Sequence, residues 1–174
     1  MSCDLITKGR TLACKDSRIG IKLVDFAPFD DANVFSVTNQ EVATIPAGID
    51  EVFRYEVKGT GNNLSEVATV DMEKRTTEIK QTLSLVLQKL TKESEVELLA
   101  LTYGRVVAFV HDYNGNVFCV GIDTGLDTTT SSKTTDDSGY KITLEAVDTK
   151  FSPYLSSSAK TALTALVSTS NVTP

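Results

Sequence analysis

His111 is the only histidine of the chain and the side chain best suited to acid–base catalysis near neutral pH. Asp112 follows it directly, and a neighbouring carboxylate is the usual partner of a catalytic imidazole. Both residues end an apolar run that predicts a strand, and adjacent strand residues point to opposite faces. We therefore interpret His111 as a polar residue at a strand end, and we expect no catalytic residues and no enzymatic activity.

Two other patterns match ligand sites in part. Gly59-Thr60-Gly61 is the nearest approach to a phosphate-binding loop, but no helix start with Lys and Ser or Thr follows it. Asp123 and Asp127, with the pair Asp136-Asp137, carry the oxygen ligands that calcium prefers, without the spacing of an EF-hand. We interpret them as a solvated acidic segment and expect no metal and no cofactor.

The three cysteines, Cys3, Cys14 and Cys119, are odd in number and form no CxxC pair. Residues 1–18 contain neither the basic nor the apolar region of a signal peptide. The longest unbroken apolar run, residues 106–110, is too short to span a bilayer. These features predict free thiols in a protein made and kept in a reducing cytoplasm, without a membrane anchor.

Length and composition indicate one globular domain. The chain has 174 residues, of which 41% are hydrophobic, and this content is sufficient for a packed core. The net charge of −6 argues against a general nucleic-acid binder, which needs clustered Lys and Arg to displace counterions from phosphate. The same charge is compatible with a surface that DNA passes without adhering.

Alternation of apolar and polar residues predicts strands at residues 52–58, 66–72, 79–90 and 140–147, and a hairpin at residues 105–122. The hairpin turns at Asn114-Gly115, which favours a type I′ turn. The segment 79–90 is long for a strand. One of its faces carries Ile79, Leu83, Leu85 and Leu87, the other carries Lys80, Thr82, Ser84 and Gln88, and Gln81 and Val86 are exceptions to the pattern.

Residues 94–103 change to the period of a helix. Val96, Leu99, Ala100 and Tyr103 fall on one helical face. Ser94 and Glu97 form a capping-box pattern, and Gly104 stands where a left-handed residue commonly ends a helix. Residues 156–174 predict a weak C-terminal helix followed by a frayed tail.

Residues 123–138 consist of six Thr, three Ser, four Asp and only three other residues. Too little apolar surface is present to offset the entropy of ordering, so we expect a long loop that neighbouring molecules order. The whole pattern predicts an N-terminal arm at 1–18 and a mainly β domain at 19–155. We expect a β-sandwich or barrel with one flanking helix.

Charge is distributed unevenly along the chain. Residues 1–18 carry four basic and two acidic side chains, whereas residues 25–56 carry seven acidic side chains and one arginine. We expect the arm of one copy to meet an acidic surface of the next, in a heterologous contact that closes into a ring. The candidate interface residues are Lys8, Arg10, Lys15, Arg18, Asp30, Asp31, Asp127, Asp136 and Asp137.

Short motifs at both ends of the chain resemble a known group of proteins. They are Gly9-Arg10, Cys14-Lys15-Asp16 and Gly20-Ile21-Lys22, then Asn114-Gly115-Asn116-Val117, Val120-Gly121, Gly125-Leu126, Ser138-Gly139-Tyr140 and Leu144-Glu145. This pattern is similar to that of structural, tail-tube-like proteins of bacteriophages that infect Bacteroidetes. The resemblance implies a virion protein, made in the bacterial cytoplasm, that forms stacked hexameric rings around a DNA channel and contacts other virion proteins.

The resemblance also implies an inner sheet that lines the channel, with the arm and the segment 123–138 linking rings. Our candidates for the channel-lining residues are Arg54, Glu56, Lys80, Thr82 and Ser84. The alternatives are a capsid decoration or head-to-tail joining protein and a small β-barrel ligand-binding module, with a hydrolase as a more distant one. Few aromatic residues (7%) and no Trp are available to line a ligand cavity.

Overall fold

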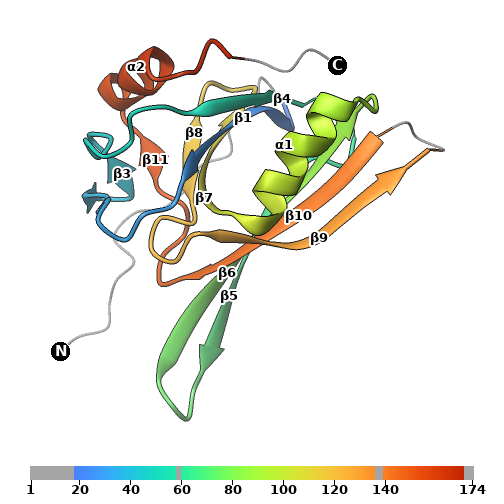
Figure 1. The fold of residues 1–174 in the computed structure, drawn as a ribbon. Coiled ribbons are helices and arrows are strands. Elements are labelled where there is room, and N and C mark those ends of the chain that lie inside the picture. Colours follow the sequence, from blue (N-terminus) through green and yellow to red (C-terminus); the bar gives the residue numbers. More distant parts are fainter. Residues whose placement is uncertain (1–17, 58–59, 136–138, 171–174) are drawn as a thin grey trace.

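The structure is a computed structural model that describes residues 18–57, 60–135 and 139–170. Figure 1 shows a strongly bent sheet with one helix beside its long strands and a second helix near the C-terminus. The prediction of a mainly β, sandwich-like fold with a flanking helix is confirmed. The elements in chain order are β1 (Ile21–Pro28), β2 (Val37–Thr38), β3 (Glu41–Val42), β4 (Phe53–Glu56), β5 (Asn63–Asp71), β6 (Thr76–Gln88), α1 (Lys92–Tyr103), β7 (Arg105–Asp112), β8 (Val117–Val120), β9 (Leu126–Thr134), β10 (Gly139–Asp148), β11 (Tyr154–Leu155) and α2 (Ser157–Ala165).

The strands form one mixed, open sheet in the order β2-β3-β11-β8-β7-β9-β10-β6-β5, and β1 joins it by pairing with β7 and β4. The pair of β3 and β11 is parallel, whereas the long strands pair antiparallel. β6 and β10 pair without interruption from Ile79 and Asp148 to Gln88 and Gly139. The two long strands, β10 and β6, therefore lie toward one end of the sheet, where β5 forms the edge.

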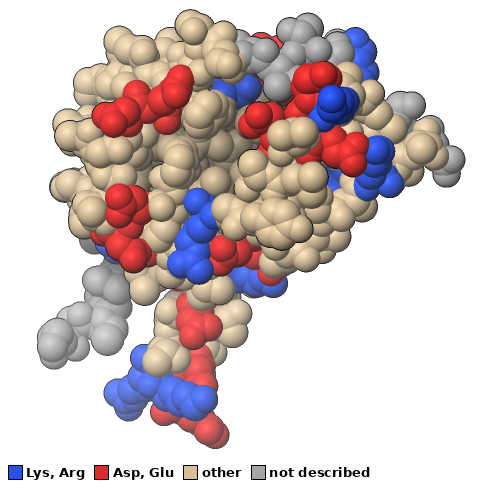
Figure 2. All heavy atoms as spheres, viewed as in Figure 1, with Lys and Arg blue, Asp and Glu red and all other residues tan. Residues whose placement is uncertain are grey.

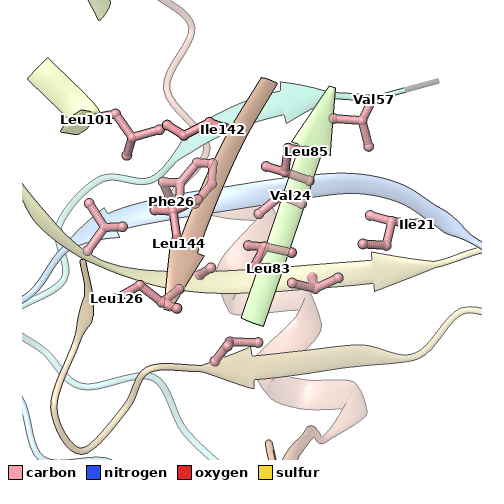
Figure 3. Packing of buried hydrophobic residues seen from close by; sticks show 14 of the residues in the cluster. Ile21, Val24, Phe26, Val57, Leu83, Leu85, Leu101, Leu126, Ile142 and Leu144 are labelled. Atoms are coloured by element: carbon pink, nitrogen blue, oxygen red, sulfur yellow. The ribbon is translucent and has the colours of Figure 1, made fainter. Parts of the chain in front are cut away.

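A first core lies between β6 and β10 on one side and β1 and β7 on the other, and α1 closes it. Figure 3 shows these side chains pointing toward one another from the separate elements. Burial of a leucine of this kind contributes roughly 1.5–3 kcal/mol. The core includes Val24, Phe26, Leu83, Leu85, Leu98, Leu101, Leu126, Ile142 and Leu144.

A second core lies on the opposite face of β1, β7 and β8. Ala27 and Phe109 of the sheet meet Val42 and Val52 of the segment that follows β1, and Leu163 of α2. Because Leu163 is fully buried, α2 is packed into the body of the protein. The predicted C-terminal helix is confirmed, and the described chain has two hydrophobic cores.

Helix α1 confirms the predicted helix at 94–103 but differs at both ends and in its buried face. Thr91 is the N-cap, and its side chain accepts a hydrogen bond from the Ser94 N–H at 3.2 Å, so the helix begins before the predicted cap. Gly104 is extended (φ −88°), not left-handed. The sheet packs against Leu98 and Leu101, which leaves the predicted apolar face exposed.

The expected loop at 123–138 was wrong, because residues 126–134 form β9. This strand pairs with β10 along its length and with β7 at Arg105 and Val106. Thr has a high strand propensity, and hydroxyl side chains on a solvent-facing strand need no apolar partners. Residues 123–125 and 135 lie outside the strand, and residues 136–138 lie outside the described residues.

The predicted hairpin of β7 and β8 is confirmed, but its turn is not type I′. Gly115 has φ +82°, whereas Asn114 is not among the residues with positive φ. The Asp112 carboxylate accepts hydrogen bonds from the N–H groups of Asn114 (2.8 Å) and Asn116 (2.7 Å). The connection is therefore a longer loop with one left-handed glycine, and the Asp112 side chain stabilises it.

Candidate functional site

The outward side of β9, β10, β6 and β5 is a broad polar surface, which we call the hydroxyl face. Its cross-strand rows follow from the register: Asn63 lies beside Ser84, Ser84 beside Thr143, and Thr143 beside Thr130. The next row joins Ser65, Thr82, Glu145 and Asp127. Their inward neighbours Leu83, Leu85, Ile142 and Leu144 belong to the first core, so strict alternation places the polar set outside.

Two ion pairs lie on or beside the hydroxyl face. The Lys80 ammonium lies 2.9 Å from the Glu145 carboxylate on the adjacent strand. The Arg105 guanidinium lies 3.2 Å from the Asp127 carboxylate. These exposed pairs contribute little to stability, but they leave the surface close to neutral. These two pairs do not form a basic patch of the kind that binds phosphate.

The candidate channel-lining residues lie on two different surfaces. Lys80, Thr82 and Ser84 lie together on the hydroxyl face. Arg54 and Glu56 belong to β4, whose intervening Tyr55 packs on Phe26 of the first core. They therefore project from the opposite side of that core. The sequence predicts which residues of one strand share a face. Whether the polar faces of two separate strands lie on the same side of the protein depends on the tertiary fold.

Arg54 forms a buried ionic cluster with Asp25 and His111. Its guanidinium donates two hydrogen bonds to the Asp25 carboxylate, at 2.8 and 2.9 Å. The His111 Nε2 lies 2.8 Å from Oδ2 of the same carboxylate, which also accepts one of the two Arg54 hydrogen bonds. Asp25 is fully buried, whereas the side chains of Arg54 and His111 are 25% and 18% exposed.

The pKa of Asp25 is lowered from its ordinary value. Burial acts to raise this pKa and is the largest influence, but the hydrogen bonds from Arg54 and His111 and their charges outweigh it. The carboxylate is therefore ionised, and it fixes both partners across three adjacent strands, β4, β1 and β7.

Sequence reasoning found no partner for His111, because Asp25 lies 86 residues away. Asp112 does not orient the imidazole and is used in the turn instead, as expected for an adjacent strand residue. One signal was present: Asp25 interrupts the apolar stretch Val24 to Ala27, where a charge needs a partner.

Few of the candidate interface residues can be placed. Lys8, Arg10, Lys15, Asp136 and Asp137 lie outside the described residues. The Arg18 guanidinium stacks over the Tyr113 ring at 4.2 Å, and its backbone bonds to Asn114. Asp30 accepts a hydrogen bond from the Ala32 N–H, Asp31 is exposed, and Asp127 pairs with Arg105. Among described residues, no ion pair joins Arg18 to any of these acids, so a contact of the arm with acidic surfaces stays a prediction.

Asp148 and Cys119 are two further buried groups that can titrate. Asp148 is nearly fully buried; its Oδ1 accepts a hydrogen bond from Thr124, and its Oδ2 has no partner among described atoms. Burial raises the pKa of Asp148, and Asp123 adds to that effect. Cys119 is a buried free thiol in the second core, and burial raises its pKa as well. Over the described ranges, no three His, Cys, Asp or Glu side chains gather in a way that could hold a metal ion.

No helix within the described part of the chain is long and apolar enough to cross a membrane. Comparisons of the chain with protein-family models, with curated proteins and with solved structures found no match.

Proposed function

We propose that this chain is a virion structural protein of the tail-tube type, whose copies assemble into stacked, hexameric rings around a DNA channel. The observation that carries the proposal is the hydroxyl face: four long strands present a wide, nearly neutral polar surface that no element of the described chain covers. The motif resemblance supplies the class of protein and the ring symmetry.

A surface of this kind suits the wall of a DNA channel. A wall with uncompensated Lys or Arg would bind phosphate through counterion release. On the hydroxyl face, the Lys80 ammonium is neutralised by Glu145, and Arg105 by Asp127. DNA can pass such a wall without a strong salt-dependent contact, which is the requirement for a conduit.

The edge of the sheet supports assembly. β5 is nine residues long and pairs with β6 in an unbroken register from Asn63 to Asp71. It contains no Lys, no Pro and no bulge, which are three of the features that protect an exposed edge, and its two acidic side chains, Glu66 and Asp71, are used in hydrogen bonds within the chain. Strand pairing with a neighbouring copy would use these backbone groups and extend the hydroxyl face around a ring.

The experiment is to measure mass in solution by light scattering over a range of protein concentrations, with negative-stain microscopy of the same samples. We expect rings or tubes with a central channel. A blocked edge, Ser65→Lys with Val67→Lys, should reduce assembly, whereas Val34→Lys, at an exposed valine away from β5, should not. A wild-type protein that stays monomeric throughout contradicts the proposal, and isolated small oligomers without tubes favour a decoration or joining role.

A further inference from the structure

The loop between β7 and β8 holds the short segment that leads into β1. The Asn114 side chain bonds to the Arg18 backbone in both directions: its Oδ1 accepts the Arg18 N–H at 2.9 Å, and its Nδ2 donates to the Arg18 carbonyl at 3.0 Å. The Arg18 guanidinium also lies over the Tyr113 ring, 4.2 Å from the ring centroid. Ile19 is 95% exposed and adds no burial. Within the described chain, residues 18–20 are therefore attached mainly by one asparagine amide and one stacked ring.

Asn114 is also the asparagine best placed to lose its amide group. It is the only asparagine of the chain that a glycine follows, and glycine has no side chain to obstruct an attack by its own backbone nitrogen. Asn114 and Gly115 are both exposed, and a Cβ placed on Gly115 would meet no atom within 4 Å. The approach of the Gly115 nitrogen to the Asn114 side chain is therefore unobstructed.

The backbone of this loop is held on both sides of the Gly115 nitrogen. The Asp112 carboxylate accepts hydrogen bonds from the N–H groups of Asn114 (2.8 Å) and Asn116 (2.7 Å). The Gly115 carbonyl accepts a hydrogen bond from the Lys160 ammonium at 2.7 Å, but among described residues nothing accepts one from the Gly115 N–H. This nitrogen therefore has no hydrogen bond that competes with an attack on the Asn114 side chain.

We propose that Asn114 is a site of spontaneous deamidation, and that the reaction releases the segment leading into β1. The Gly115 nitrogen gives up its proton and attacks the Asn114 Cγ. The new N–Cγ bond closes a cyclic imide, the Cγ–Nδ2 bond breaks, and ammonia leaves with the proton. Water then opens the imide at either of its two carbonyl groups, which leaves an aspartate or an isoaspartate at position 114.

Either product breaks the contact with Arg18. An ionised aspartate has acceptor oxygens and no donor, so one oxygen takes the place of Nδ2 and faces the Arg18 carbonyl, which is also an acceptor. An isoaspartate adds a methylene to the loop backbone and moves the carboxylate away from Arg18. Figure 2 shows acidic and basic side chains interspersed over the face in view. One further carboxylate therefore acts through this local contact, and not through the overall charge pattern.

The contact with Arg18 also controls the rate. The two hydrogen bonds restrain the Asn114 amide, so the reaction proceeds mainly from the fraction of molecules in which the contact is open. Because the product cannot restore the lost donor, the release is permanent. This inference does not rest on the proposed function, and the two can fail separately.

Peptide mapping by mass spectrometry measures the conversion in the full chain, kept folded in mildly alkaline buffer. Asn114 should convert about tenfold faster, or more, than Asn116 of the same loop, because the β-branched Val117 hinders attack on Asn116. Arg18→Ala removes the stacked guanidinium and should speed the conversion at Asn114. An Asn114 that stays intact as long as Asn116 overturns the proposal, and an unchanged rate in Arg18→Ala overturns the control by the contact.

Amide hydrogen exchange measures the release. Asn114→Asp reproduces one product, and its residues 18–20 should exchange about tenfold faster than those of the wild type. The matched control is Asn63→Asp, which adds the same charge at an exposed position of β5 and should exchange like the wild type there. Circular dichroism checks that both variants are folded. If Asn114→Asp keeps the wild-type exchange at residues 18–20, or if Asn63→Asp matches its increase, the proposed release is wrong.

Discussion

The β5–β6 hairpin has a base inside the body of the protein and a tip outside it, and the two ends differ in one respect. At the base, Leu83 and Leu85 of β6 are 0% and 1% exposed, because β1, β10 and α1 cover them. At the tip, Val70 and Met72 are more than half exposed. Figure 1 shows the hairpin continuing past the other strands.

The base and the tip of the hairpin differ in whether other elements cover their apolar side chains, and not in how β5 and β6 pair. The register of β5 and β6 is unbroken from the base to the tip, and apolar residues occur along both halves. Polar groups at the base are also satisfied: the Glu66 carboxylate accepts hydrogen bonds from the backbone and side chain of Ser152. Polar groups at the tip are satisfied too, because Asp71 accepts hydrogen bonds from the N–H groups of Glu73 and Lys74, and only the apolar Val70 and Met72 stay exposed there.

The largest loss of stability should come from removing the buried carboxylate of Asp25. Asp25→Ala leaves Arg54 and His111 without their shared acceptor, and it should lower the free energy of unfolding by about 3–5 kcal/mol. Glu145→Ala removes the acceptor of the exposed Lys80 pair and should cost at most about 1 kcal/mol. Urea unfolding of both variants measures the contrast, and equal losses would contradict it.

Truncation along the hairpin should give graded costs. Leu83→Ala creates a cavity in the first core and should destabilise by about 2–5 kcal/mol. Val70→Ala at the tip should change monomer stability by no more than about 0.5 kcal/mol. Thermal unfolding at a concentration below assembly provides the comparison, and a large loss for Val70→Ala would show that the tip is covered within its own chain.

Gln81 should show an intermediate effect. It is fully buried, its Oε1 accepts a hydrogen bond from the Gly121 N–H at 2.9 Å, and its Nε2 donates to the Lys150 carbonyl at 3.3 Å. Gln81→Ala leaves both backbone groups unsatisfied and should cost about 1–3 kcal/mol. The control is Gln88→Ala, an exposed position of the same strand; unfolding midpoints that match would exclude the assigned role.

The smallest effects should appear in the dependence of stability on pH. The lowered pKa of Asp25 means that its stabilisation is present above about pH 4, the unfolded value, and is lost as pH falls below it. The raised pKa of Asp148 has the opposite sign: stability falls as pH rises from about 4 through its folded value. Asp25→Asn should flatten the first slope and Asp148→Asn the second, and unfolding curves between pH 3 and 7 test both.

Local patterns in the sequence predicted a large part of the fold. The alternation at 79–90 corresponds to β6, that at 140–147 to β10, and Asn114-Gly115 to the β7–β8 turn. Gln81 was noted as an exception to the pattern, yet it follows the alternation strictly and points inward, where hydrogen bonds satisfy it. These elements were predictable because neighbours in the chain determine strand period, turns and helix caps.

The candidate site depended more on the tertiary structure. Thr82 and Ser84 were predicted to share a polar face, and they do, but Arg54 and Glu56 project from another side of the first core. The partner of His111 is remote in sequence, so no spacing rule identifies it.

By itself, the sequence determined the mainly β class, the long strands β6 and β10 and the position of the helix, because each follows from periodicity over a few residues. Only the tertiary structure decided that residues 126–134 complete the sheet, that α1 buries Leu98 and Leu101 in place of Val96 and Leu99, and that Asp25 joins Arg54 to His111. The physical reason is that these three features depend on contacts between segments far apart in the sequence. A strand pairs, a helix with two apolar sides buries one of them, and a buried charge finds its partner according to which arrangement gives the lowest free energy for the whole chain.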